Sequence, residues 1–156
     1  MFKIGKLFHL THVVSDLAAV DKWYDDVFGV TRFYRGYEKM AGRDASLIAI
    51  GEVIMEPMMP ARVANLLNPS VEKFHDRFGQ HFHSIAWYVD DVAEISTQLD
   101  QHGLRLFNIS GKTVEPGEEK FVFSSLSCKR RLKAVVCEFR NRYRQFESTS
   151  HQPVSR

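Results

Sequence analysis

The sequence predicts an α+β fold made of two successive β-α-β-β-β modules, and three observations support this. Helical periodicity follows an extended segment twice, each helix is preceded by good N-cap residues, and three further extended runs follow each helix. Asp91 follows Asp16 by 75 positions, and the same offset carries Val14-Ser15-Asp16-Leu17 onto Val89-Asp90-Asp91-Val92. The halves agree in pattern rather than identity, which predicts an internal repeat.

The first module, residues 5–60, opens with an extended run from Leu7 to Val14 that is rich in β-branched and aromatic residues. Apolar residues then recur at steps of three and four, which predicts an amphipathic helix that begins after Ser15 and Asp16 and ends at Gly29. We expect three short strands to complete the module, at 31–37, 45–50 and 52–56, with Pro57 and Pro60 closing it.

The second module, residues 81–140, repeats this order. Extended residues 82–89 precede a helix that starts at Val92 and ends near Gly103, and three extended runs follow at 104–109, 120–126 and 132–139. A connector, residues 61–80, carries the spacing of a short helix that ends at Gly79. One domain over residues 1–140 is therefore expected, with a polar and frayed tail at 141–156.

The composition excludes several classes of protein. The chain has 156 residues with 44% hydrophobic and 26% charged residues, which is typical of a globular domain. A net charge of +2 argues against a nucleic-acid or anionic-membrane partner, and two cysteines encode no disulfide framework. Because neither a signal peptide nor a run of about 20 apolar residues is visible, we expect a cytoplasmic protein.

Four polar residues on the predicted strands are candidates for a metal site. They are two histidines and two glutamates, at positions His9, Glu56, His83 and Glu138. Imidazole nitrogens and carboxylate oxygens are suitable ligands for a divalent ion, and a glutamate inside an apolar run is costly to bury without a partner. The alternative is that both glutamates lie solvated at strand ends. His12 falls on the opposite strand face from His9 and is interpreted as structural.

Several segments resemble the vicinal oxygen chelate superfamily, which includes glyoxalase I, methylmalonyl-CoA epimerase, ring-cleaving dioxygenases and bleomycin- and fosfomycin-resistance proteins. The resemblance covers about residues 7 to 140. Its most specific parts are His9-Leu-Thr-His-Val-Val-Ser-Asp-Leu17, Phe82-His-Ser-Ile-Ala-Trp-Tyr-Val-Asp-Asp-Val92 and the epimerase-like Glu56-Pro-Met-Met-Pro60. It implies a cupped mixed sheet that holds one metal, with His9, Glu56 and Glu138 as three of four ligands.

The fourth ligand position departs from the family pattern. The offset of 75 residues places Ser84, rather than His83, opposite His9. Either a β-bulge turns His83 inward as a ligand, or the position is a serine and the metal site is incomplete. His81 shares a face with His83 and is a weaker candidate.

Two further segments also depart from that pattern. The epimerases carry a second catalytic carboxylate near the third strand of the first module, where this chain offers Glu38 or Asp44. Before the last strand, the family's His-Pro-rich turn is replaced by a basic run that includes Lys129, Arg130, Arg131 and Lys133. That run is either a solvated loop or a grip for a phosphate or carboxylate.

The function expected first is that of a metal-dependent lyase or isomerase/epimerase acting on a small carbonyl or thioester compound through an enediolate. One divalent ion (Zn, Ni, Co, Mn or Fe) would polarise the carbonyl, and Glu138 or Glu56 would move the proton. One alternative is a ring-cleaving dioxygenase with a two-histidine, one-carboxylate iron site. Another is a metal-free small-molecule or drug-sequestering protein. Residues expected to contact the small molecule are Ser84, Tyr88, Phe121 and Phe123. The resemblance also implies a homodimer.

Overall fold

The computed structural model describes residues 4–30, 32–118, 121–126 and 135–141, and in the last two segments Phe123 alone is described with its side chain. The strands are β1 (Ile4–Val13), β2 (Arg32–Glu38), β3 (Arg43–Ile50), β4 (Val53–Pro60), β5 (His81–Val89), β6 (Leu106–Phe107), β7 (Phe121–Leu126) and β8 (Val135–Asn141). The helices are α1 (Leu17–Phe28), α2 (Ser70–Phe78) and α3 (Val92–Gln101).

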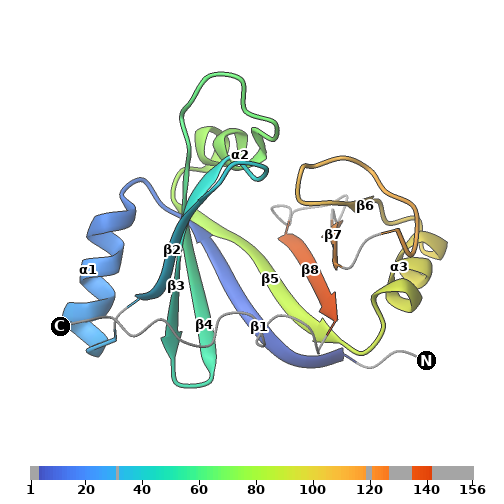
Figure 1. Ribbon diagram of the computed structural model, residues 1–156, viewed down its shortest axis with the longest axis horizontal. Helices are drawn as coiled ribbons and strands as arrows, with labels where there is room; N and C mark the ends of the chain where they lie inside the picture. Colours follow the sequence, from blue (N-terminus) through green and yellow to red (C-terminus); the bar gives the residue numbers. More distant parts are fainter. Residues whose placement is uncertain (1–3, 31, 119–120, 127–134, 142–156) are drawn as a thin grey trace.

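All the strands join one mixed sheet in the order β2-β3-β4-β1-β5-β8-β7-β6. Within the first half β1 pairs parallel with β4, and within the second half β5 pairs parallel with β8. The antiparallel pair of β1 and β5 joins the halves and crosses the middle of the molecule (Figure 1). The predicted α+β fold with a mixed sheet made of two equivalent halves is therefore confirmed.

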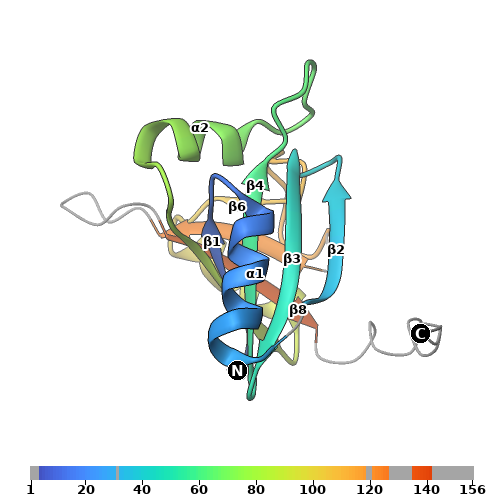
Figure 2. The same ribbon diagram turned by 90° about the vertical axis from the view of Figure 1, so that its left-hand side faces the viewer.

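Helices α1 and α3 lie at opposite ends of the molecule, each beside the sheet of its own half (Figure 1). In the second half, Val92 and Ile95 of α3 join a buried cluster with Val89 and Leu106. Helix α2 crosses above one end of the first half and runs across the direction of α1 (Figure 2). Its Val71 packs against Val13, Ala45 and Met58, so α2 covers one end of the sheet face that these residues share.

The two long helices start with the same device. The Asp16 carboxylate accepts a hydrogen bond from the Ala19 backbone N–H, and the Asp91 carboxylate accepts one from Glu94, both at 2.9 Å. These are the positions that the 75-residue offset relates, so the predicted caps are confirmed. Helix α1 ends at Gly29 in the left-handed conformation (φ 63°), as the sequence predicts.

Some predicted boundaries are wrong. Strand β4 does not end at Glu56 but continues through Pro57 to Pro60, because it lies between β1 and β3 and both neighbours pair with its last residues. Strand β6 has only two residues, where the sequence predicts six at 104–109. The basic run at 129–133 and most of the tail at 141–156 lie outside the described residues. In the part of the chain that is described, no helix is long and apolar enough to cross a membrane.

Candidate functional site

A buried carboxylate, Glu56 on β4, is the centre of the candidate site. Arg43 donates a hydrogen bond from Nη2 to Glu56 Oε1 over 2.9 Å, and the Thr11 hydroxyl donates one to Oε2 over 2.8 Å. His9 Nε2 lies 3.2 Å from Glu56 Oε2. The Glu56 side chain is only 7% exposed. A buried carboxylate needs such partners, because an unpaired charge is costly away from water.

Strand pairing explains why these residues meet. Thr11 of β1 lies directly beside Glu56 of β4. His9 lies two residues before Thr11 on β1, beside Ile54, and is on the same face. Because side chains alternate along a strand, His9, Thr11 and Val13 point to one side of the sheet, and all three are buried. Arg43 lies two residues before Ala45 on β3 and therefore shares this face, which we call the inner face.

His83 reaches this environment because β5 is irregular at that point. Thr11 pairs with Ser84 but the next residue, His12, pairs with Phe82, so His83 is the extra residue of a bulge. Its ring packs edge-on against Phe74 with centroids 4.8 Å apart, and its Nδ1 lies 3.0 Å from the Ser84 hydroxyl. The bulge that the sequence offered as one alternative is therefore present.

The charged residues Arg43 and Glu56 affect the protonation of His83. Burial, with a smaller contribution from the positive charge of Arg43, lowers the pKa of His83 from 6.5 to about 4, and the negative charge of Glu56 opposes both effects. At neutral pH the imidazole is therefore uncharged, with one nitrogen able to donate and the other to accept a hydrogen bond.

Strand pairing continues from His9 across the second half of the sheet, and we call the paired residues the His9 row. His9 pairs with Ala86 of β5, Ala86 pairs with Glu138 of β8, and Glu138 pairs with Phe123 of β7. The backbone of Glu138 is thus placed two strands from His9, although its side chain lies outside the described part. Phe121 is likewise placed by its backbone alone, opposite Arg140.

The other residues predicted to contact a small molecule lie near the His9 row. Ser84 is buried and pairs with Thr11, and Tyr88 packs against Phe8 with ring centroids 4.8 Å apart. On the opposite face, His12 lies 6.3 Å from the Tyr24 ring of α1, and burial lowers its pKa. This location fits the structural role expected for His12.

Arg43 and Thr11 are site residues that the sequence reasoning missed. Around the start of β3, the sequence offers Glu38 or Asp44 as a second carboxylate. Glu38 instead accepts a hydrogen bond from the Met40 backbone N–H, and Asp44 lines a separate pocket of about 510 Å³. The signal for Arg43 was Glu56 itself, since a glutamate buried in an apolar strand calls for a cation.

A curved sheet of two equivalent halves, with a buried polar cluster on its inner face, defines a glyoxalase-like protein. Residues 8–123 match the family model described as the Glyoxalase/Bleomycin resistance protein/Dioxygenase superfamily, and the chain belongs to that superfamily. No curated protein is similar enough in sequence to match.

Solved structures of low sequence identity share the fold. Methylmalonyl-CoA epimerase from Mycobacterium tuberculosis is 18% identical, with 89% of this chain and 90% of that chain covered and a TM-score of 0.66. A Streptomyces coelicolor methylmalonyl-CoA epimerase variant in complex with 2-nitronate-propionyl-CoA is 15% identical (88% and 96% covered, TM-score 0.67). A hypothetical protein from Bacillus halodurans C-125 is 22% identical (91% and 97% covered, TM-score 0.68).

Members of this superfamily often bind a divalent metal ion, which requires several protein donors around one point. Among the residues whose side chains are described, no three His, Cys, Asp or Glu residues gather as a ligand group. Both Glu56 oxygens already accept hydrogen bonds, and the cation beside them is the Arg43 guanidinium. As arranged, the described residues do not fit a divalent ion, which needs at least three protein donors around one point.

Proposed function

We propose that this chain is an enzyme of the isomerase, epimerase or lyase kind that moves a proton beside the carbonyl group of a small carbonyl or thioester compound. The observation that carries the proposal is the buried Glu56 on the inner face, held by Arg43 and Thr11 beside His9. The fold is shared with methylmalonyl-CoA epimerases, one of them in complex with a CoA ester analogue. That likeness supports a thioester as the first substrate to test.

The chemistry requires a base that takes the proton and donors that stabilise the oxyanion left behind. We assign the base to Glu138, with Glu56 as the second choice because both of its oxygens are already engaged. Neutral His83, together with His9, would orient the substrate oxygen. The contact surface proposed for the rest of the substrate is Ser84, Tyr88, Phe121 and Phe123.

The three residues that the resemblance implies as metal ligands (His9, Glu56 and Glu138) and the candidate for the fourth position, His83, are thus the polar residues of this proposal. No step of it runs through a metal ion. The homodimer implied by the same resemblance stays a prediction, which sedimentation of the purified chain would test.

Proton abstraction can be measured directly as deuterium uptake. The purified chain is incubated in D₂O with methylmalonyl-CoA, propionyl-CoA and the adduct of methylglyoxal with glutathione, and each product is analysed by mass spectrometry and NMR. We expect enzyme-dependent deuterium at the carbon beside the carbonyl of at least one compound. In Glu138→Gln, uptake should fall by about 100-fold or more, the range expected for loss of a general base.

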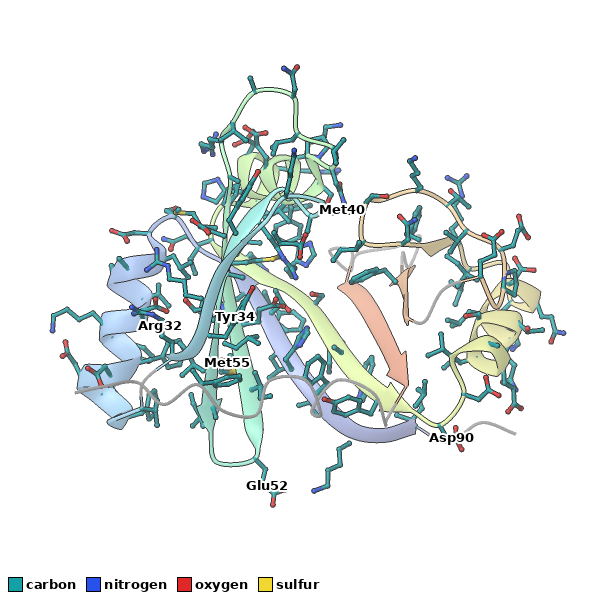
Figure 3. The ribbon with its side chains drawn as sticks, viewed as in Figure 1. Arg32, Tyr34, Met40, Glu52, Met55 and Asp90 are labelled. Carbon is teal, nitrogen blue, oxygen red and sulfur yellow. The ribbon has the colours of Figure 1, made fainter. Side chains whose placement is uncertain are left out.

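The matched control is Glu52→Gln, which removes a carboxylate of the same kind far from the site. Glu52 lies at the tip of the turn between β3 and β4, and its side chain is 90% exposed (Figure 3). Uptake by Glu52→Gln should equal that of the wild type. Failure of all three compounds to take up deuterium, or full activity in Glu138→Gln, would contradict the proposal.

A second candidate function is reversible binding of a small molecule without chemistry. The observation that favours it is the buried Arg43–Glu56 pair. A guanidinium and a carboxylate fixed in this way can hydrogen-bond polar groups of a bound molecule without reacting with it. Binding of the same compounds by calorimetry, without deuterium uptake, would favour this function over the first.

A further inference from the structure

The cation that faces Glu56 is a side chain of this chain. Arg43 and Glu56 are both largely buried, with side chains 14% and 7% exposed, and 2.9 Å separates Nη2 from Oε1. The second Arg43 amino group, Nη1, lies 3.3 Å from the Met58 sulfur. The guanidinium is thus fixed by a strong acceptor on one side and by core packing on the other.

A residue of the second half of the sheet also reaches this face. His83, the extra residue of the bulge opposite Thr11, packs its ring edge-on against Phe74 of α2. Phe74 in turn packs against the buried core of the inner face, where Arg43 and Glu56 lie. Arg43 is therefore paired with an implied ligand, Glu56, on the face to which the second half brings its candidate ligand, His83.

A divalent ion and the guanidinium would exclude each other at this place. The ion would have to displace the Arg43 guanidinium from Glu56 Oε1. It would then lie close to that guanidinium, which is unfavourable because repulsion between like charges is strong in a buried site. Thr11 donates a hydrogen bond to the other oxygen, Oε2, and His9 Nε2 lies 3.2 Å from it, so both Glu56 oxygens already have close partners.

We propose that Arg43 takes the place of the divalent ion, so that the inner-face cluster of this chain is complete without a metal. The guanidinium supplies the positive charge that balances Glu56 and would attract an anionic oxygen of a bound molecule. This inference concerns the site of the proposed function, but its test reads metal content and needs no activity.

The test uses the full chain after dialysis against a chelator. Co²⁺ or Zn²⁺ is added, unbound metal is removed, and bound metal is counted by elemental mass spectrometry, while visible absorption reports Co²⁺ ligation. We expect less than about 0.1 ion per wild-type chain. In Arg43→Met, which keeps the length of the side chain but removes its charge, we expect about one ion per chain, as for a site of histidine and carboxylate donors without a competing cation.

Two further variants make the outcome specific. His9→Ala added to Arg43→Met should abolish the gained Co²⁺ spectrum, which would show that the ion sits at the inner-face cluster. Arg62→Met is the matched control, because Arg62 is 55% exposed and pairs with Asp76 and Glu72 outside the cluster. It should bind no more metal than the wild type.

Stoichiometric metal in the wild type that is lost in Glu56→Gln would overturn the proposal, and this measurement does not depend on whether Arg43→Met folds. A folded Arg43→Met variant that gains no metal would overturn it too, because Arg43 would then not be what excludes the ion. If the wild type binds no metal but takes up no deuterium, the proposed function fails while this inference stands.

Discussion

At the scale of single residues, the site depends on which groups balance a buried charge. His9 and Glu56 could be proposed as candidates from sequence because polar residues inside apolar strands are conspicuous. Arg43 could not, because an arginine near a predicted strand start is equally consistent with a solvated side chain, and its partner lies on a neighbouring strand. Pairing between strands, which the sequence does not state, decides whether such a residue is inside or outside.

His83 gives a prediction for the pH dependence of stability. Its pKa is lowered from 6.5 to about 4 in the folded chain, mainly by burial. Between these values the unfolded chain takes up a proton that the folded chain refuses, so the free energy of unfolding falls as the pH drops from about 6.5 towards 4. The loss due to His83 is at most roughly 3–4 kcal/mol, since each pKa unit corresponds to about 1.4 kcal/mol.

Urea unfolding followed at several pH values would measure this effect. In His83→Phe, which keeps a ring against Phe74, the loss of stability over this pH range should be smaller than in the wild type. Part of the slope will persist, because burial also lowers the pKa of His12. His102→Phe is the control, since His102 is exposed. An unchanged slope in His83→Phe would contradict the assignment.

At the scale of elements, most helices and strands could be predicted because local signals agree with the final fold. The boundaries of α1 are those the sequence indicates, since Asp16 and Gly29 mark its ends by local chemistry. Strand β4 was underestimated because Pro57 is a strong local signal that pairing on both sides overrides. The bulge at His83 could be offered only as an alternative, because it depends on the register between β1 and β5.

The paired caps give the prediction at this scale. Removing the capping carboxylate in Asp16→Ala leaves the Ala19 N–H without its acceptor, and Asp91→Ala does the same to Glu94. Each change should lower the free energy of unfolding by about 1 kcal/mol, or the melting temperature by about 2–4 °C. Thermal unfolding followed by circular dichroism would check this, with Glu52→Ala as an exposed control. If the cap variants were as stable as the control, the two capping hydrogen bonds would not contribute to stability as predicted.

At the scale of the whole molecule, the repeat made the architecture predictable. Two copies of one pattern imply two equivalent halves, and the resemblance supplied the way they join. The halves meet through β1 and β5, which pair from Ile4 and Val89 at one end to Val13 and His81 at the other. The inner-face cluster draws Thr11 and Glu56 from one half and His83 from the other, so the site exists only when both halves are folded together.

This continuity predicts that the halves unfold as one unit. If one half unfolded alone, the other would expose the full length of β1 or β5 as an unpaired edge and lose the packing across the seam. Each half carries a tryptophan: Trp23 on α1, 51% exposed, and Trp87 on β5, packed against the cluster under α3. Trp23→Phe and Trp87→Phe each keep one tryptophan. We therefore expect the tryptophan fluorescence of the two variants to report the same urea transition, once the effect of each substitution on overall stability is subtracted. Fluorescence midpoints that differ from those of far-ultraviolet circular dichroism in the same variant would show that the halves unfold separately, and the shared site could then open without global unfolding.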